Sequence, residues 1–264
     1  MSTDTPRPVV LITGAARRIG RAIALDLASR GFDIAIHYRH SREEAAAVIA
    51  EIQALGRRGA ALPADLAKPE EVARLIPDCC AALGAPSVLV NNASEFQPDS
   101  VGSTTLASWT AHLDINLRAP VFLAQDMMRH LPDEIEGNII NIIDQRVWKL
   151  TPEFFSYTLS KTGLWTATRT LAQALAPRIR VNAIGPGPVL RSVHQTDADF
   201  AAEVQSTLLK RGPSLIEIAT AVRFILDTPA MTGQMIALDG GQHLTWSEGE
   251  HNAVSVANKP EAAT

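Results

Sequence analysis

The strongest constraint on the fold is a regular alternation between short apolar runs and longer segments of helical periodicity. The first run, Val9–Ile12, is apolar throughout and ends at Thr13-Gly14, as expected of a strand buried on both faces. A helical pattern follows over Arg18–Ser29, and Gly31 is placed to end that helix. Because parallel strands are joined by right-handed crossovers through helices, this alternation predicts a parallel sheet covered by helices.

The alternation continues to residue 238. Further strands are predicted at residues 32–37, 60–63, 87–90, 138–143, 179–184 and 234–238, which makes seven in all. Further helices are predicted at residues 41–55, 69–83, 105–130, 154–176 and 214–226, and Ser41 with Glu44 has the spacing of a capping box. The predicted fold class is therefore α/β: a single-domain, Rossmann-type, doubly wound parallel sheet of seven strands with helices on both faces.

No change in composition marks a linker, so residues 1–245 are predicted to form one domain. Residues 185–212 interrupt the alternation with prolines and only a weak helical signal near 199–209. Long segments of this kind are commonly lids or binding loops, so we expect a lid at about 188–212. Residues 246–264 are a polar tail, which is either disordered or packed against a partner subunit.

Composition excludes several classes of function. With 24 basic and 28 acidic residues the net charge is −4, which gives no support for nucleic-acid binding. No uncharged apolar run approaches the length that spans a bilayer, so no membrane association is expected. Adjacent Cys79 and Cys80 fit neither a zinc site nor a disulfide framework, and His194 and His243 lack partners at metal-ligand spacing. We expect a cytoplasmic protein without a metal.

The segment from Thr13 to Gly20 connects the first strand to the first helix and has the character of a nucleotide-binding loop. Gly14 permits a tight turn, Gly20 permits close packing of the helix on the strand, and free N–H groups at the helix start suit a pyrophosphate. Tight strand–helix turns also occur without ligands. Its place after the first buried strand of an alternating fold nevertheless predicts dinucleotide binding.

The end of the second strand indicates which dinucleotide is bound. An acidic residue there would bind the ribose 2′-OH of NAD, but the chain has no acid between His37 and Ser41. Arg39, His40 and Ser41 instead offer donors that suit a 2′-phosphate, although an ordinary basic turn facing solvent would look the same. We expect NADP(H) rather than NAD(H).

Tyr157 and Lys161 lie four residues apart in a predicted helix, so their side chains share one face. A tyrosine is a poor acid or base near neutral pH, and a neighbouring ammonium group would bring the pKa of the phenol toward the working range. Such a pair is common by chance on amphipathic helices. Together with the nucleotide-binding loop, it predicts proton transfer beside a bound dinucleotide.

With these motifs the chain resembles the short-chain dehydrogenase/reductase family over about residues 8–245. The motifs appear in the family's order: Thr13-Gly14 with Gly20, Asp65, Asn91-Asn92-Ala93, Asn116, Tyr157 with Lys161, Pro186-Gly187, and Asp239-Gly240-Gly241. The resemblance implies that Tyr157 donates a proton, that Lys161 lowers its pKa and holds the nicotinamide ribose, and that Asn116 steadies a proton relay. Asn92 would lie by the adenosine ribose and Asp65 by the adenine.

Two residues depart from the family's usual pattern. Arg18 replaces the middle glycine of the loop, and Asp144 replaces the serine that stands 13 residues before the tyrosine. A serine there donates a hydrogen bond to a carbonyl oxygen of the substrate, whereas an ionised aspartate would repel the developing oxyanion. An aspartate suits a ring nitrogen or amino group. Ketone or 3-oxoacyl reduction is therefore disfavoured.

Arg18, Asp144 and the segment Asn92-Ala93-Ser94-Glu95-Phe96 resemble the pteridine reductase branch, including dihydromonapterin-reductase-like proteins. The resemblance implies that Phe96 stacks a pterin against the nicotinamide, that Arg18 contacts pyrophosphate and pterin, and that Asp144 assists Tyr157. Glu95 and residues 145–149 match no part of these patterns. The family is also expected to form homotetramers, and the apolar surface of the two long predicted helices is consistent with subunit packing.

These inferences assign every candidate site residue. The catalytic residues are Asn116, Asp144, Tyr157 and Lys161. The cofactor-binding residues are Gly14, Arg18, Ile19, Gly20, Arg39, His40, Ser41, Asp65, Leu66, Asn92, Ala93, Ser94, Lys161, Pro186 and Gly187. The substrate-binding residues are Arg18, Phe96, Asp144 and Tyr157. The predicted function is NADPH-dependent hydride transfer to a C=N bond of a pterin-like substrate; the alternatives are a carbonyl or alcohol dehydrogenase/reductase and a catalytically silent NADP-binding subunit.

Overall fold

The computed structural model describes residues 8–246 and contains one parallel sheet of seven strands in the order β3-β2-β1-β4-β5-β6-β7. The strands are β1 Val9–Ile12, β2 Asp33–Tyr38, β3 Gly59–Pro63, β4 Val88–Asn91, β5 Gly137–Ile142, β6 Ile179–Pro186 and β7 Met235–Leu238. All six neighbouring pairs are parallel, which confirms the predicted fold class. The predicted tail lies outside the described residues except for Trp246.

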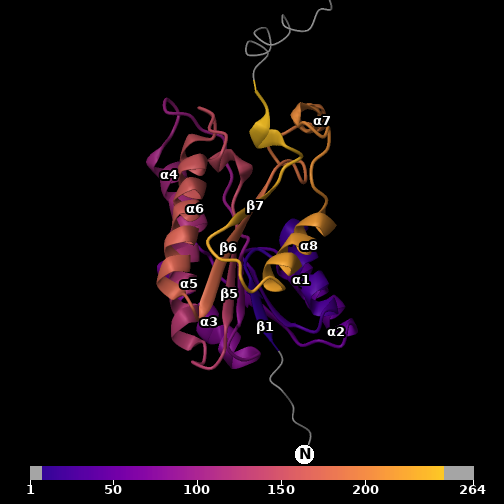
Figure 1. Ribbon diagram of the computed structural model, residues 1–264, viewed down its shortest axis with the longest axis vertical. Coiled ribbons are helices and arrows are strands. Elements are labelled where there is room, and N and C mark those ends of the chain that lie inside the picture. The colour runs from indigo at the N-terminus through magenta and orange to yellow at the C-terminus, as the bar shows by residue number, and fades with distance from the viewer. Residues whose placement is uncertain (1–7, 247–264) are drawn as a thin grey trace, which may run out of the picture.

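Helices cover both faces of the sheet (Figure 1). One face carries α1 Arg18–Ser29, α2 Arg42–Ala54 and α8 Leu215–Leu226, and the other carries α3 Pro69–Ala82, α4 Leu106–Leu113, α5 Ala119–His130 and α6 Phe155–Leu175. Alternate residues of β1 feed the two cores, because Val10 packs with the α1 side and Leu11 with the α3 side. Each core is built from aliphatic side chains, which explains why the strands read as uninterrupted apolar runs.

The connection order places the candidate site at one edge of the sheet. The chain runs from β1 outward to β2 and β3 and then returns to place β4 on the other side of β1. This reversal leaves a crevice between the loops that follow β1 and β4, and ligands of doubly wound sheets bind at such a point. Helix α7, Asp197–Ser206, and the short helix η3, Gln242–Leu244, lie near the same end of the sheet (Figure 1).

The predicted helix 105–130 is interrupted, and this corrects the sequence-based expectation. Residues Asp114–Arg118 form a π-helical turn, η1, between α4 and α5, in which the N–H of Ala119 donates to the carbonyl of Asp114. Pro120 has no N–H, so the carbonyl of Asn116 lacks its α-helical donor. The π-helical turn accommodates this loss, and it contains Asn116, one of the predicted catalytic residues.

Two smaller expectations also change. Ser41 precedes α2 but its side chain makes no capping hydrogen bond, so the predicted capping box with Glu44 is not formed. The segment predicted as a lid contains a helix, α7, that begins earlier than the weak signal suggested because Thr196 and Asp199 form a reciprocal capping box. Within residues 8–246, no helix combines the length and apolar character needed to cross a membrane.

A buried chain of amide and hydroxyl groups ties the sheet to α6. The side-chain amide of Asn91 donates to Oδ1 of Asn141 at 2.8 Å, and the amide of Asn141 donates to the Thr168 hydroxyl at 2.9 Å. Thr168 in turn donates to the carbonyl of Leu164 at 2.8 Å. Because all of these groups are shielded from water, losing one partner leaves others without compensation.

Asn141→Ala should therefore lower the free energy of unfolding by about 2–4 kcal/mol, since it removes two buried hydrogen bonds and leaves the Asn91 amide and Thr168 without their partners. Urea denaturation of the purified protein measures this change. Asn138→Ala is the matched control in the same strand, because the Asn138 Oδ1 is already buried without a partner among the described residues. Equal losses in the two variants would contradict the assignment.

Candidate active site

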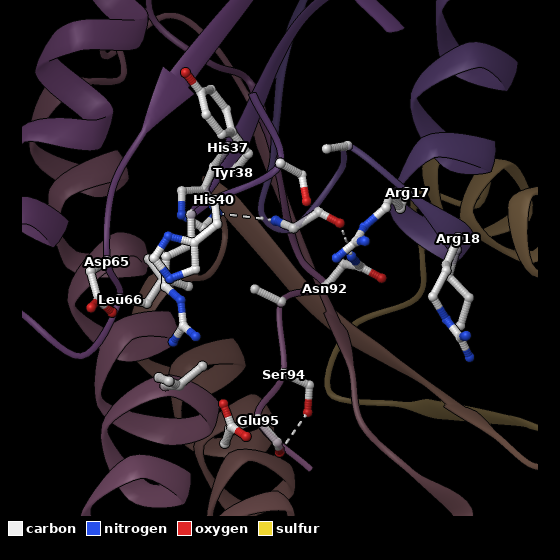
Figure 2. Close-up of a pocket in the computed structure, with 17 residues that line it drawn as sticks. Arg17, Arg18, His37, Tyr38, His40, Asp65, Leu66, Asn92, Ser94 and Glu95 are labelled. Atoms are coloured by element: carbon white, nitrogen blue, oxygen red, sulfur yellow. Dashed lines mark hydrogen bonds between the residues drawn. The ribbon is translucent and has the colours of Figure 1, made fainter. Parts of the chain in front are cut away.

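Two adjoining cavities occupy the crevice at the carboxyl ends of the strands. The first, of about 430 Å³, lies beside the ends of β1, β2 and β4 (Figure 2), and the second, of about 320 Å³, reaches the start of α6 and the lid. Four residues line both cavities: Arg18, Ile19, Asn92 and Ser94. The predicted cofactor and substrate residues therefore face one continuous, two-part site.

The glycine loop has the tight geometry that a nucleotide-binding loop requires. Gly14 has φ of +63°, and a Cβ there would lie 2.9 Å from the Ala93 backbone. A Cβ on Gly20 would lie 2.5 Å from the carbonyl oxygen of Gly14 and 2.6 Å from the Asn92 amide. That amide donates to the carbonyls of Thr13 and Gly14, so β4 fixes the loop through hydrogen bonds.

Arg18, which stands where the family usually has a glycine, has a backbone conformation that favours glycine. Its φ is +53°, in the left-handed region that a side chain disfavours. Its guanidinium donates to the carbonyls of Leu190 and Arg191 at 3.0 Å each, so it connects the loop to the segment predicted as a lid. Arg18 therefore lies between the two cavities, as a residue predicted to contact both cofactor and substrate must.

His37 supports the glycine loop through a hydrogen bond, a role that was not predicted from the sequence. The N–H of Gly14 donates to Nδ1 of His37 at 3.0 Å, so the ring proton resides on Nε2, which donates to the carbonyl of Ala64 at 2.9 Å. Burial lowers the pKa of His37 and keeps the ring neutral. A histidine at the end of the apolar run Ile34-Ala35-Ile36 was the available signal.

Figure 2 shows His40, Asp65 and Leu66 on the side of the first cavity opposite Arg18. Arg39, His40 and Ser41 line the first cavity together with Asp65 and Leu66. The Asp65 carboxylate accepts from the N–H of Ala67 at 3.0 Å, which holds the loop after β3 in place. Every predicted cofactor residue except Gly20 lines one of the two cavities; Lys161, Pro186 and Gly187 line the second. Gly20 lies behind the loop, where it packs against the carbonyl of Gly14 and the Asn92 amide.

Tyr157, Asp144 and Lys161 meet at the floor of the second cavity. The Tyr157 hydroxyl donates to Oδ2 of Asp144 at 2.9 Å. Lys161 lies one turn further along α6, where its ammonium donates to the carbonyl of Ile142 at 3.0 Å and lies 5.8 Å from the centroid of the Tyr157 ring. The end of β5 and the first turns of α6 thus position all three groups.

The electrostatics of this cluster correct one expectation. Lys161 was expected to lower the pKa of Tyr157, but burial and the neighbouring carboxylate of Asp144 raise that pKa well above its ordinary value. Burial also raises the pKa of Asp144, and it lowers the pKa of Lys161 to about 8. The phenol is therefore held in its protonated form.

Asn116 braces the site through its side chain. Its Oδ1 accepts from the N–H of Glu95 at 2.8 Å, and its amide donates to the carbonyl of Glu95 at 2.9 Å and to the Ser160 hydroxyl at 3.0 Å. These bonds join the segment after β4 to the π-helical turn and to α6. The side chain makes no direct contact with the Tyr157 hydroxyl, so its predicted part in a relay would be indirect.

Aromatic rings form one wall of the second cavity. Phe96 stacks on Phe154 with centroids 4.6 Å apart and planes 10° apart, and it meets Tyr157 edge-on at 4.7 Å. The guanidinium carbon of Arg146 lies 4.8 Å from the centroid of Phe154 on the same wall. Phe96 is thus in the cavity, as predicted, whereas Phe154 and Arg146 were not assigned from sequence.

A second buried polar cluster, also missed from sequence, holds the segment that carries Phe96. Nδ1 of His112 donates to the Ser156 hydroxyl at 2.7 Å, and this hydroxyl donates to Asp99. Asp99 also accepts from the N–H of Ser156 at 3.1 Å, while Nε2 of His112 accepts from the N–H of Gln97 at 3.1 Å. Residues 97–99 are thereby fastened to α4 and α6 behind the aromatic wall.

Comparisons with known proteins agree with this geometry. The sequence model of a family described as enoyl-(acyl carrier protein) reductase matches residues 14–243. The chain is 33% identical over 239 residues to the 3-oxoacyl-[acyl-carrier-protein] reductase FabG of Staphylococcus epidermidis, a match that covers 89% of this chain and 98% of that protein.

Solved structures include more similar proteins. FolM alternative dihydrofolate reductase 1 from Brucella canis, complexed with NADP, is 51% identical with a TM-score of 0.87, covering 92% of this chain and 97% of that one. The corresponding protein of Brucella suis, also in complex with NADP, is 51% identical with a TM-score of 0.89, covering 92% and 98%.

The buried ammonium of Lys161 should make stability depend on pH. Burial lowers the pKa of Lys161 to about 8 in the folded protein, whereas its pKa in the unfolded chain is about 10.5. In that window the unfolded state binds more protons, so the free energy of unfolding should rise with pH, by up to about 3 kcal/mol. Urea denaturation from pH 7 to 10.5 should show this rise in the wild type and its loss in Lys161→Met. Parallel curves for the two proteins would refute it.

Proposed function

The chain belongs to the short-chain dehydrogenase/reductase family of oxidoreductases, and from this premise we propose that it is an NADPH-dependent reductase of a pterin-like C=N bond. The observation that carries the proposal is the hydrogen bond from Tyr157 to Asp144. The carboxylate occupies the place where the family usually has a serine. It suits a substrate whose reacting atom is a ring nitrogen that receives a proton.

The first cavity has the properties that NADP(H) requires. The close approaches at Gly14 and Gly20 leave a cradle with no room for a side chain, which suits a pyrophosphate at the start of α1. Arg39, His40 and Ser41 line the part of this cavity that would receive a 2′-phosphate. The two Brucella proteins, at 51% identity, are complexed with NADP. When bound, NADPH supplies the hydride of the reaction.

The residues of the second cavity manage the proton. Reduction of a C=N bond adds a hydride to carbon and a proton to nitrogen, and Tyr157 is the group that donates this proton. Burial and Asp144 keep the phenol protonated by raising its pKa. Because burial also raises the pKa of Asp144, this carboxyl can take up a proton and return it to Tyr157 between turnovers. Lys161, by the family resemblance, holds the nicotinamide ribose.

The aromatic wall favours a flat substrate. Phe96 presents a ring in the second cavity and touches Tyr157 edge-on, so a planar heterocycle that stacks on Phe96 lies beside the proton donor. Ser94 and Arg18 line both cavities and offer hydrogen bonds to a polar ring. The Brucella relatives, named alternative dihydrofolate reductases, support a substrate that contains a pterin.

A carbonyl substrate is the second candidate, because the FabG relative is a 3-oxoacyl-[acyl-carrier-protein] reductase. Asp144 distinguishes the two, since an ionised carboxylate beside the proton donor opposes the oxyanion that develops during carbonyl reduction. The presence of Tyr157, Lys161 and Asn116 in one site disfavours a silent subunit. The homotetramer and the cytoplasmic location stay predictions.

Gly20→Ala should weaken NADPH binding at least 10-fold, because the new methyl group must displace the Gly14 carbonyl and the Asn92 amide that shape the cradle. Fluorescence titration with NADPH measures the dissociation constant. Gly102→Ala is the control, since a methyl group there would meet only the Ser100 hydroxyl at 4.0 Å. An unchanged dissociation constant in Gly20→Ala would contradict the assignment of the glycine loop as the pyrophosphate-binding site.

Two further variants test the chemistry, with NADPH oxidation followed by the loss of its absorbance in the presence of a dihydropterin or a panel of ketones. Tyr157→Phe should lower dihydropterin turnover about 100-fold or more while NADPH still binds, because the proton donor is lost.

Asp144→Ser should lower dihydropterin turnover and leave ketone turnover unchanged or higher, because the carboxylate that opposes an oxyanion is gone. Turnover of ketones alone by the wild-type protein would favour the carbonyl candidate instead.

A further inference from the structure

Gln145 and Arg146 line the second cavity, and they begin the stretch 145–149 that matches nothing in the family patterns. The short helix η2, Gln145–Val147, follows Asp144 directly, and the N–H of Arg146 donates to Oδ1 of Asp144 at 2.8 Å. The proposed proton-relay carboxyl therefore fixes the backbone of Arg146. The Arg146 side chain then runs along the cavity wall to the ring of Phe154.

The guanidinium of Arg146 has hydrogen-bond donors to spare. Its only polar side-chain contact in residues 8–246 is a long one, 3.4 Å from Nη1 to the Thr151 hydroxyl, and it has no ion pair there. The two other cations of the cavity are engaged, because Arg18 donates to two lid carbonyls and Lys161 to the carbonyl of Ile142. Arg146 is thus the cation best placed to bind an anion.

In the described part of the chain, no acidic side chain of the cavity forms an ion pair with this guanidinium. Asp144 is occupied by the Tyr157 hydroxyl and the backbone N–H of Arg146. Glu203, on α7, accepts from the side-chain amides of Gln195 and Gln242. A planar guanidinium with free donors, held against an aromatic face, is suited to bidentate contact with a carboxylate.

A continuous aromatic path links the proton donor to this cation. Tyr157 meets Phe96 edge-on at 4.7 Å, Phe96 stacks on Phe154 at 4.6 Å, and Arg146 lies 4.8 Å from the Phe154 centroid. A substrate with its reducible ring at Tyr157 and an extension along this path would end at the guanidinium.

We propose that Arg146 binds a carboxylate that the substrate carries beyond its pterin ring, and so selects a glutamate-conjugated dihydropterin such as dihydrofolate over one with an uncharged side chain. The inference rests on the proposed function, because it assumes a pterin ring beside Tyr157. To the proposed function it adds a carboxylate-bearing side chain on the substrate, and it names Arg146 as the residue that binds this carboxylate.

The test compares two substrates with the same reducible ring. Dihydrofolate carries a glutamate, and 7,8-dihydrobiopterin carries an uncharged side chain. Arg146→Met should lower the ratio of kcat/KM for dihydrofolate to that for dihydrobiopterin about 10- to 100-fold, mainly through the KM for dihydrofolate. Arg146→Lys keeps the charge without the planar fork and should fall between the wild type and Arg146→Met.

Arg169→Met is the matched control. Arg169 also lies over an aromatic ring, 5.9 Å from the centroid of Trp165, but it is exposed and lines neither cavity, so its loss should leave both the ratio and the activity unchanged. Thermal unfolding of all variants identifies any that fail to fold. If Arg146→Met fails to fold, the ratio of kcat/KM values measured with Arg146→Lys tests the proposal in its place.

The remaining outcomes overturn the inference in separable ways. The charge of Arg146 also reaches Asp144 and Tyr157, so a role through those groups would lower kcat for both substrates by the same factor. Equal effects, or none, therefore refute carboxylate binding. A wild type that reduces dihydrobiopterin but not dihydrofolate refutes it while leaving the proposed function intact. A wild type that reduces neither substrate overturns both proposals before any variant is made.

Discussion

The parallel pairing of buried strands is the constraint on which the rest of the molecule depends. Because all seven strands point the same way, every connection that leaves a carboxyl end emerges at one edge, and the reversal between β1 and β4 opens a crevice there. The strands contribute few reactive side chains of their own. They hold the loops that follow them, and each loop brings one part of the site: the glycine turn, the basic turn, the segment of Phe96, and Asp144.

Rigid support of these loops comes from buried polar groups that water cannot reach. His37 holds the glycine loop, Asn116 holds the segment after β4, and the Asp99–Ser156–His112 cluster holds the far end of that segment. Each such group would be costly if left without a partner, so the loops have few alternative positions at comparable energy. The same burial shifts the pKa values that the proposed chemistry uses, so support and reactivity have one physical origin.

The site was predictable where its chemistry depends on short spacings along the chain. The Tyr157–Lys161 pair, the glycine loop and the replacement of a serine by Asp144 were all visible in the sequence, and their side chains line the two cavities. The direction in which the pKa of Tyr157 shifts was not predictable, because it depends on burial of the phenol and on the orientation of a carboxylate 13 residues away. The position of Arg146 in the site was not predictable from the sequence, because it depends on a tertiary contact with Phe154.

The sequence by itself determined the α/β fold, the order of strands and helices along the chain, and the residue types at the site, because periodicity, turn residues and glycine requirements are local properties. Only the tertiary structure decided how these parts act on one another. It placed Arg18 between two cavities, turned the segment around Asn116 into a π-helix, and buried Asp144 against Tyr157. Those outcomes depend on which groups exclude water from which others, and that is a property of the packed chain rather than of any segment of it.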